Sequence, residues 1–335
     1  MKPFKYQRAT NENVAINSVT ADRLAAFLAG GTNLVDLMKE NILQPDKLID
    51  ITGLDLSQIK SAGSNVSIGA LATNTETANH PLVRTNFPLL SQAILSGASA
   101  QIRNMATNGG NLNQRTRCMY FYDKTMPCNK RSPGSGCAAI KGLNRMHAIF
   151  GWSDKCVAVF PSDMAVALAA LNAIIKVRTS GGKIRSIPFY DYHRLPGNNP
   201  EIENNLKRGE LVTSIEVPKN NYAKHSYYLK VRDRASYAFA LISVAAGLEI
   251  DAGGTIRDSN IAMGGVAHKP WRATIAEKML IGKKPSVQLF EDAATMEMER
   301  AKPLEHNKFK VELGKRAIVR TLNISLRNDL EGAQQ

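Results

Sequence analysis

Four cysteines are the residues of this 335-residue chain whose type and spacing most clearly suggest chemistry. They are Cys118, Cys128, Cys137 and Cys156, and no thiol precedes or follows this segment. The absence of a Cys-x-x-Cys pair disfavours an ordinary zinc ribbon or finger, and a chain of this length does not need a disulfide scaffold. Four thiolates from one loop are the usual ligand set of an iron–sulfur cluster. A zinc ion and free or paired cysteines remain alternatives at this point.

The composition around the cysteines fits a ligand-bearing loop. The stretch from Cys128 to Cys137 is rich in turn-forming residues and poor in apolar ones, which predicts irregular backbone. Basic residues surround the cysteines, and positive charge lowers the pKa of thiols and offsets the charge of a cluster. These residues are Arg115, Arg117, Lys124, Lys130, Arg131, Lys141 and Arg145.

Two glycine turns are the second candidate feature. One is Ala29–Leu34, with the sequence Ala-Gly-Gly-Thr-Asn-Leu, and the other is Thr107–Asn111, with Thr-Asn-Gly-Gly-Asn. Consecutive glycines let backbone N–H groups approach an anion closely, so two such turns could hold a dinucleotide from two sides. Neither turn is a P-loop or a Rossmann fingerprint. The alternative interpretation is two unrelated tight turns.

Hydrophobic patterning predicts the elements that position these turns. In the first part of the chain we expect a short helix over 22–28, a helix from 35 and another over 88–100, and strands at 49–51 and 65–71. A helix over 164–171 with Ser162 or Asp163 as N-cap follows, then a hairpin of strands 173–178 and 183–187 and a strand at 211–217. Beyond a polar boundary near 220–224 we expect strands at 227–231, 238–250 and 255–264, then helices over 273–281, 287–302 and 309–328. Strands followed by helices suggest a separate α+β domain.

Composition narrows the class of protein. Lys and Arg number 43 and Asp and Glu 29, which gives a net charge of +14, while hydrophobic residues make up 44% of the chain. This balance argues against global disorder. The basic residues are dispersed and aromatic residues are only 6%, so we expect no nucleic-acid binding. An anionic cofactor, acidic partner subunits or a plainly basic surface would each account for the charge. We also expect no membrane span, and the start of the chain lacks the apolar region of an export signal.

Several motifs occur in one order along nearly the whole chain, and together they resemble a known family. The chain is similar to the FAD-binding medium subunits of molybdenum hydroxylases, the xanthine dehydrogenase group. The motifs that carry the resemblance are Phe27–Leu34, Ile68–Thr73, Gln101–Leu112, Pro161–Asp163, Gly209–Pro218 and Tyr228–Tyr237. Asn108 departs from the pattern, because many members have an apolar residue before the Gly-Gly pair.

The resemblance implies an α+β fold: a two-subdomain FAD-binding domain of the vanillyl-alcohol-oxidase type at 1–222 and a smaller α+β flavoprotein domain at 223–335. It implies that the turn residues wrap the pyrophosphate, namely Leu28, Ala29, Gly30, Gly31, Thr32, Asn33 and Leu34. Thr107, Gly110 and Asn111 would contact phosphate and ribitol. Asp163 would lie near the adenosine half, Val212 would pack against the flavin ring system, and Lys230 would lie near the isoalloxazine. No residue is expected to act as a catalytic acid or base.

The cysteine segment is a second departure from most of the family, in which only a short segment links the Gly-Gly-Asn turn to the Ser-Asp pair. All four cysteines fall in this added segment, at about 113–158. A minority of members, similar to 4-hydroxybenzoyl-CoA reductase and the bacterial periplasmic aldehyde oxidoreductases, carry a [4Fe–4S] cluster in such an insertion. The resemblance therefore implies Cys118, Cys128, Cys137 and Cys156 as cluster ligands. His147 and His193 are expected to be surface residues.

The function that the resemblance implies is electron transfer within a molybdenum-dependent aldehyde oxidoreductase. A large molybdenum-cofactor subunit and a small [2Fe–2S] subunit would be the partners, and FAD would pass electrons to an external acceptor such as ferredoxin. The cluster would lie on that path or only stabilise the loop. Periplasmic location by co-export with a partner is expected, with the cytoplasm as the alternative. The competing hypotheses are a self-contained FAD oxidoreductase, the flavin subunit of a related hydroxylase or CoA-thioester reductase, and a non-enzymatic iron–sulfur or zinc protein.

Overall fold

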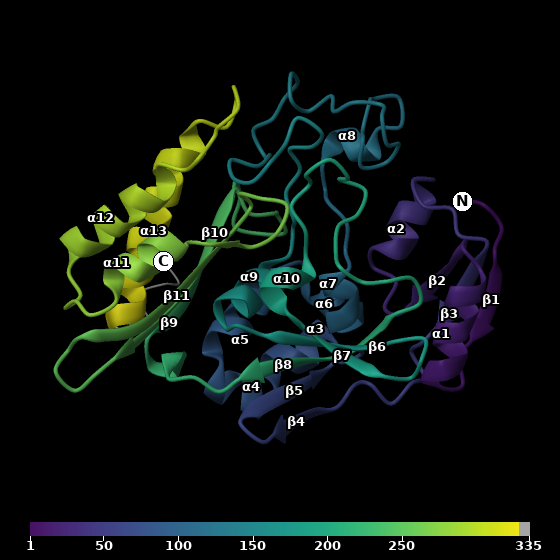
Figure 1. Cartoon of the computed structure of the whole chain (residues 1–335), viewed down its shortest axis with the longest axis horizontal. Helices are drawn as coiled ribbons and strands as arrows, with labels where there is room; N and C mark the ends of the chain where they lie inside the picture. Colours follow the sequence, from purple (N-terminus) through teal and green to yellow (C-terminus); the bar gives the residue numbers. More distant parts are fainter. Residues whose placement is uncertain (328–335) are drawn as a thin grey trace.

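The computed structural model describes residues 1–327, and these residues form three β-sheets that lie one after another along the molecule (Figure 1). The first sheet has three strands, the second five and the third four. The predicted α+β architecture is confirmed: the first two sheets form a larger N-terminal part, and the third sheet forms a smaller C-terminal domain. Positions 328–335 of the predicted C-terminal domain, and the last residue of its predicted final helix, lie outside the described residues.

The N-terminal sheet is parallel, with the strand order β1–β3–β2. It consists of β1 (Lys5–Arg8), β2 (Ala25–Leu28) and β3 (Lys47–Asp50), and α1 (Glu12–Ala21) and α2 (Leu34–Lys39) are its connecting helices. The helix predicted over 22–28 is wrong. Ala25–Leu28 instead pairs along its whole length with β3, and this tertiary pairing overrides the local preference of an alanine- and leucine-containing stretch.

The middle sheet is antiparallel throughout, in the order β4–β5–β8–β6–β7. The predicted hairpin is confirmed as β6 (Ile174–Arg178) and β7 (Ile184–Pro188). The other strands are β4 (Ile59–Ala62), β5 (Asn65–Gly69) and β8 (Leu211–Pro218). Helices α3 (Asn74–Asn79), α4 (Pro81–Asn86), α5 (Pro88–Ser96), α6 (Ala100–Met105), α7 (Asn108–Leu112), α9 (Asp163–Ala170) and α10 (Phe189–Tyr192) belong to this part.

Helix α9 lies between the middle sheet and the C-terminal domain and packs on both α5 and β10. Ser162 is its N-cap, as predicted, and accepts a hydrogen bond from the backbone N–H of Ala165. Every helical residue after Asp163 is buried, which fits a helix that is apolar all round. The N-terminus of α9 therefore holds the Ser162–Asp163 pair at a fixed place between two domains.

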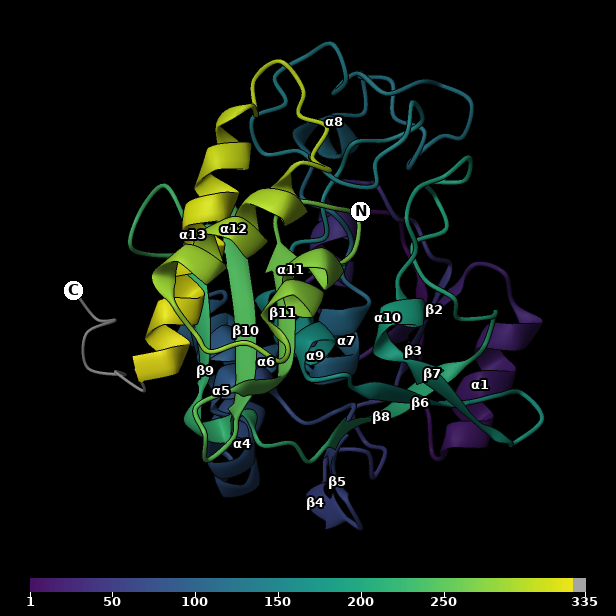
Figure 2. The same cartoon turned by 60° about the vertical axis from the view of Figure 1, so that its left-hand side comes forward.

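The C-terminal domain is an antiparallel sheet covered on one face by helices (Figure 2). Its strands are β9 (Ser226–Val231), β10 (Ile242–Ile250), β11 (Ile256–Gly264) and β12 (Trp271–Arg272), and they follow the short η1 turn (Tyr222–Lys224). Helices α11 (Thr274–Leu280), α12 (Val287–Met298) and α13 (Phe309–Arg327) complete it. The three predicted strands and three predicted helices are present; β9 begins one residue earlier than predicted, and the described parts of the others are shorter than predicted.

The cysteine segment lies at one end of the molecule, above the two larger sheets in Figure 1. Its one helix is α8 (Met119–Tyr122), and the rest is irregular backbone. The segment is nevertheless well anchored, because the N–H groups of Ile149 and Phe150 both donate to the carbonyl of Val266 in the C-terminal domain. Within residues 1–327, no helix is both long enough and apolar enough to cross a membrane.

Candidate functional site

The first glycine turn connects β2 to α2 and is pressed against the second. A Cβ atom on Gly30 would come within 1.8 Å of the carbonyl oxygen of Met105, so only glycine fits at this position. Gly31 has a φ of +73°, a backbone conformation that also favours glycine. The Gly-Gly pair therefore lets the backbone of the turn lie directly on the end of α6, which leads into the second turn.

The second turn begins a short helix, α7, rather than forming an open loop. Thr107 caps this helix by accepting a hydrogen bond from the N–H of Gly110. The amide of Asn108 is fully buried and bonded to Gly69, Asn74 and Thr77. Asn108 is thus a structural residue that ties α7 to β5 and α3, which explains the polar side chain at this buried position.

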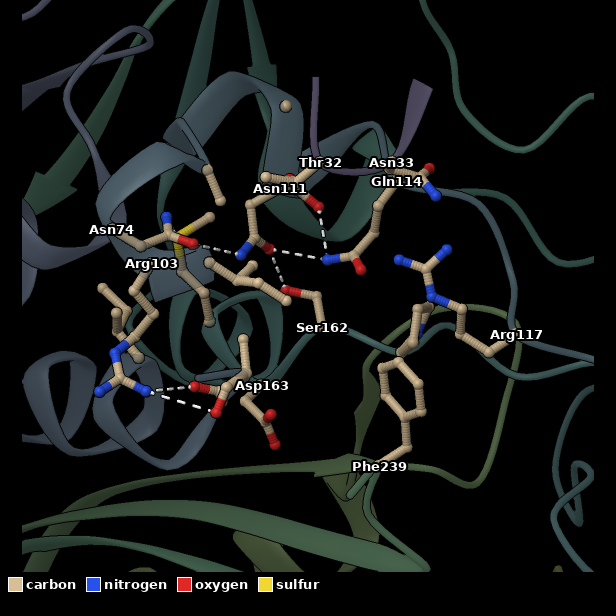
Figure 3. Close-up of a pocket in the computed structure, with 18 of the residues that line it drawn as sticks. Thr32, Asn33, Asn74, Arg103, Asn111, Gln114, Arg117, Ser162, Asp163 and Phe239 are labelled. Carbon is tan, nitrogen blue, oxygen red and sulfur yellow. Dashed lines mark hydrogen bonds between the residues drawn. The ribbon is translucent and has the colours of Figure 1, made fainter. Parts of the chain in front are cut away.

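Two cavities meet at these turns. The first, of about 370 Å³, is drawn in Figure 3 and extends from the turns to Lys230 and Phe239 of the C-terminal domain. The second, of about 300 Å³, extends from the turns along Phe27 and Leu43. Thr32, Asn33 and Gly110 line both cavities, and volumes of this size are typical of cofactor sites.

Asn33 is the polar side chain where the cavities meet. Its Oδ1 accepts a hydrogen bond from the backbone N–H of Arg115 at 2.9 Å, which fixes the orientation of the amide. Its Nδ2 is buried and has no hydrogen-bond partner. A buried amide donor without a partner is costly unless a ligand accepts its hydrogen bond, so this atom fits a phosphate oxygen.

The polar wall of the first cavity is a chain of side-chain hydrogen bonds visible in Figure 3. Asn111 donates to Asn74 at 2.9 Å and accepts from Gln114 at 3.0 Å and from Ser162 at 2.5 Å. The amide of Asn111 is therefore held by protein partners on both sides. This network connects the second glycine turn to the N-terminus of α9.

The far end of the first cavity contains a buried ion pair. The Nζ of Lys230 lies 2.8 Å from the Oδ2 of Asp163, and the two side chains are 5% and 9% exposed. Tyr228 donates to the other carboxylate oxygen at 2.6 Å, and Lys230 also donates to the carbonyl of Ser96 at 3.0 Å. Burial, followed by the charge of Asp163, raises the pKa of Tyr228 well above its usual value. Although the charges of Lys230 and Asp163 neutralise each other, both side chains line the first cavity and can still bond a polar ligand there.

The structure separates some predicted site residues and joins others. Asp163 and Lys230 touch each other, so both side chains lie at the same end of the first cavity. The roles predicted for them, Asp163 by the adenosine half and Lys230 by the isoalloxazine, stay predictions. Val212 lines the second cavity, on the other side of the turns. Leu28 lines neither cavity and supports the turn from β2. The other predicted residues line one or both cavities: Ala29, Gly30, Gly31, Thr32, Asn33, Leu34, Thr107, Gly110 and Asn111.

Sequence reasoning missed several residues that complete the first cavity. Arg103 of α6 donates to the carbonyl of Gly97 at 2.6 Å and so fixes the turn before α6. Ala98 in that turn has a φ of +50°, a strained value for alanine that is typical of functional sites. Arg117 lies over the ring of Phe239 at 5.6 Å. Arg103 stands inside a glycine-rich motif, and Arg117 was noted only as a cation near the cysteines, whereas Phe239 gave no signal.

The four cysteines line one small cavity. Cys118 also lines a neighbouring cavity, together with Arg117. Cys128 and Cys137 form an isolated β-bridge, and Asn129 ties the surrounding loops together by accepting from the N–H groups of Gly134 and Gly136 and donating to the carbonyl of Lys155. Among residues 1–327, no group of three or more His, Cys, Asp or Glu side chains is arranged to hold a metal ion. The cavity that the four cysteines line has a volume of about 10 Å³.

The thiols experience opposite effects on their pKa values. Burial raises the pKa of Cys118 to about 11. A hydrogen bond with Cys156 lowers the pKa of Cys137 to about 6, while that bond and burial raise the pKa of Cys156.

Charged residues fasten the cysteine cavity to the rest of the chain. Lys130 is buried, and its Nζ lies 2.8 Å from the carboxylate of Glu203, to which Arg115 also donates. Although burial acts to raise the pKa of Glu203, Lys130 and then Arg115 hold that pKa below its ordinary value. Lys130 and Arg115, two of the seven cations expected near the cysteines, are therefore engaged in an ion-pair network that anchors the loop.

The prediction that His147 and His193 are surface residues is wrong. Their exposed fractions are 4% and 3%, and burial lowers the pKa of each to about 4. His193 lies among the rings of Phe160, Phe189 and Tyr192 and its Nε2 bonds the carbonyl of Leu112. The Nε2 of His147 lies 3.1 Å from the Sγ of Cys118.

Comparison with known protein families agrees with this geometry. Residues 2–220 match the FAD binding domain in molybdopterin dehydrogenase, and residues 227–324 match the CO dehydrogenase flavoprotein C-terminal domain. The chain belongs to the family of FAD-binding medium subunits of the molybdenum hydroxylases. It is a flavoprotein and a subunit of an oxidoreductase complex of that family.

Individual relatives match over nearly the whole chain. The chain is 47% identical over 323 residues to the aldehyde oxidoreductase FAD-binding subunit PaoB of Escherichia coli K12, which covers 96% of this chain and 98% of that protein. It is 30% identical to the glyceraldehyde dehydrogenase medium chain of Sulfolobus acidocaldarius, covering 90% of this chain and 89% of the relative.

Solved structures confirm the fold. A reconstituted CO dehydrogenase from Oligotropha carboxidovorans superposes with a TM-score of 0.77 at 21% identity, covering 98% of this chain and all of that one. Quinoline 2-oxidoreductase from Pseudomonas putida 86 gives a TM-score of 0.75 at 22% identity, covering 99% and 98% of the two chains.

Proposed function

We propose that this chain is the FAD- and [4Fe–4S]-containing electron-transfer subunit of a molybdenum-dependent aldehyde oxidoreductase. The observation that carries the flavin part is the strip of Thr32, Asn33 and Gly110 at which two cofactor-sized cavities meet. A dinucleotide has two bulky ends joined by a diphosphate, and this arrangement offers two spaces joined by a line of donors. The aldehyde part rests on the 47% identity to PaoB.

The two cavities differ in a way that orients the cofactor. The second cavity is lined by Phe27, Leu37, Leu43 and Val212, an apolar surrounding that suits an adenosine. The first is lined by Asp163, Lys230 and Arg103 together with aromatic Phe239, and polar groups of this kind suit the oxygen- and nitrogen-bearing edge of an isoalloxazine. We therefore assign the isoalloxazine to the first cavity and the adenosine to the second, which moves Asp163 and Val212 to the ends opposite to those implied by the motifs.

FAD would supply the ability to accept electrons singly or in pairs. The tasks of the chain are to position the ring and to stabilise its reduced form. Lys230 carries a cationic N–H toward the first cavity while Asp163 and the carbonyl of Ser96 hold that side chain in place. Because a preorganised cation costs no reorganisation when negative charge develops nearby, this pair suits a ring that gains electrons.

The four cysteines would hold the [4Fe–4S] cluster. Support comes from the convergence of Cys118, Cys128, Cys137 and Cys156 on one cavity, from their lack of disulfide bonds and from the buried cation Lys130 beside them. A third cavity of about 300 Å³ lies between the cysteine cavity and the first cavity. It shares Cys118 with the cysteine cavity, and Asp163 and Phe239 with the first cavity. This adjacency favours a place on the electron path over a purely structural role.

Partners and location complete the proposal. A large molybdenum-cofactor subunit would oxidise the aldehyde, a small [2Fe–2S] subunit would pass on the electrons, and an external acceptor such as ferredoxin would receive them. The net charge of +14 suits acidic partners. We place the complex in the periplasm by co-export with a partner, on the resemblance to bacterial periplasmic aldehyde oxidoreductases. The thiolate cluster would be assembled under reducing conditions before export.

Purification of the chain with and without its partners tests this function. We expect the tagged chain to co-purify with a large and a small subunit, with flavin absorption bands and a broad iron–sulfur shoulder. Flavin bands with no partner subunits and no iron would indicate a self-contained flavin oxidoreductase. A spectrum without flavin would contradict the proposal in any form.

A further inference from the structure

His147 is a buried residue that the proposed function does not use. Its Nε2 atom lies 3.1 Å from the Sγ of Cys118, within the hydrogen-bond range for sulfur. Among the side chains of residues 1–327, His147 supplies the one nitrogen at this distance from a cysteine sulfur. The two residues are 29 positions apart in the sequence. The contact therefore forms only when the loop is folded.

The backbone of His147 is held in place by hydrogen bonds at both its carbonyl and its N–H group. The carbonyl of His147 accepts from Lys310 at 3.0 Å and from Asn307 at 3.1 Å, both of which are fully buried. Its N–H donates to the carbonyl of Asn144 at 3.0 Å. Asn144 is itself fully buried and bonds Ala139 and Ile140. Three buried polar residues therefore fix the backbone from which the ring reaches Cys118.

The position of the ring proton follows from its two nitrogen atoms. The Nδ1 of His147 is buried and has no hydrogen-bond partner, so the bond at Nε2 alone selects the tautomer. A thiolate sulfur that binds iron has no proton and can only accept a hydrogen bond. With Cys118 as a cluster ligand, the proton belongs on Nε2, where it is paired, instead of on Nδ1, where a buried donor would be orphaned.

The contact also lies on the side of the cysteine site that faces the flavin site. His147 and Cys118 both line the cavity that shares Arg117, Asp163 and Phe239 with the flavin cavity. A hydrogen bond at this sulfur therefore acts where the two proposed redox centres approach each other.

We propose that His147 donates an N–H···S hydrogen bond to Cys118 and thereby raises the reduction potential of the cluster. The inference rests on the proposed function, since it requires iron at the four cysteines. Hydrogen bonds to ligand sulfurs stabilise the more negative, reduced form of a cluster, and outer-shell donors are a principal means by which proteins set its potential. His147 is thus a tuning residue that acts through Cys118 and does not bind iron.

The test is a redox titration of the purified complex, followed by the EPR signal of the reduced cluster. We expect His147→Phe, which keeps a ring but removes the donor, to shift the midpoint potential to a more negative value with iron and flavin content unchanged. His147→Gln, whose amide can donate, should restore much of the wild-type potential. The matched control is His268→Phe, because His268 is also buried but neither of its ring nitrogens has a partner.

Each possible result either supports or overturns the hydrogen bond between His147 and Cys118. A potential in His147→Phe equal to that of wild type, or an equal shift in His268→Phe, overturns the hydrogen bond. If His147→Phe fails to retain iron, pulsed EPR of the wild-type protein labelled with ¹⁵N-histidine decides instead: coupling of the cluster to a histidine nitrogen supports the inference, and its absence overturns it. A wild-type complex without iron overturns the cluster itself, which is a failure of the proposed function and is recognised before any variant is made.

Discussion

Asp163 and Lys230 form a buried ion pair in which the carboxylate Oδ2 and the ammonium Nζ are 2.8 Å apart. The two residues are 67 positions apart in the chain and come from the N-terminus of α9 and from β9. They join the FAD-binding domain to the C-terminal domain beside the first cavity. A change that breaks this pair would therefore disturb both the contact between the two domains and the first cavity.

Removal of one partner of this pair should destabilise the protein strongly. In Lys230→Met, the carboxylate of Asp163 stays buried without its cation, which typically costs about 3–5 kcal/mol in unfolding free energy. Asp163→Asn combined with Lys230→Met should cost less than the sum of the two single changes, because neither charge is then left unpaired. Urea denaturation measures the cycle, and additive free energies would contradict a coupled pair.

The close approach of the two glycine turns makes Gly30 intolerant of any side chain. Gly30→Ala should separate the turn from Met105, since the new Cβ would lie 1.8 Å from a carbonyl oxygen, and the purified protein should lose most of its flavin. Gly181→Ala is the matched control, because its new Cβ would have only one neighbour, at 3.9 Å. Flavin is measured by absorbance after release from the protein, and a Gly30→Ala protein with wild-type flavin content would refute the turn assignment.

The cysteine cavity should be separable from the flavin cavity. Cys118→Ser should remove iron and leave flavin in place, because Cys118 lines the cysteine cavity and not the cavities assigned to FAD. Ser132→Ala, an exposed change in the same segment, should affect neither. Iron per chain is measured by a colorimetric assay, and unchanged iron in Cys118→Ser would show that the sulfur is no ligand.

Acid should destabilise the chain through its buried histidines. Burial lowers the pKa of His193 to about 4 from the usual 6.5, so between these values the unfolded chain binds a proton that the folded chain does not. The unfolding free energy therefore falls as the pH falls from about 6.5 to about 4, by up to about 1.4 kcal/mol per pH unit for this group. His193→Phe should reduce that slope in urea titrations at several pH values; a slope identical to that of wild type would contradict the assignment.

Local signals predicted the elements well where one short stretch determines them. The Ser162 cap, the hairpin around 180–182 and the amphipathic C-terminal helices depend on neighbouring residues, and all are present. The strand Ala25–Leu28 was mistaken for a helix because its pairing partner β3 lies about twenty residues further along the chain.

The site residues show the same limit. The glycine turns were recognisable, because close backbone contact demands glycine. The pairing of Asp163 with Lys230 and the burial of His147 were not, because each depends on how separate domains pack. From the sequence, Asn108 was a departure from the motif. The structure explains its polar side chain by three buried hydrogen-bond partners.

A crystal structure of the complex with FAD bound would test the two-cavity cofactor site most directly. We expect diphosphate density along Thr32, Asn33 and Gly110, with the isoalloxazine beside Asp163 and Lys230 and the adenosine beside Val212. A diphosphate away from both glycine turns, or an isoalloxazine against Val212, would contradict this assignment.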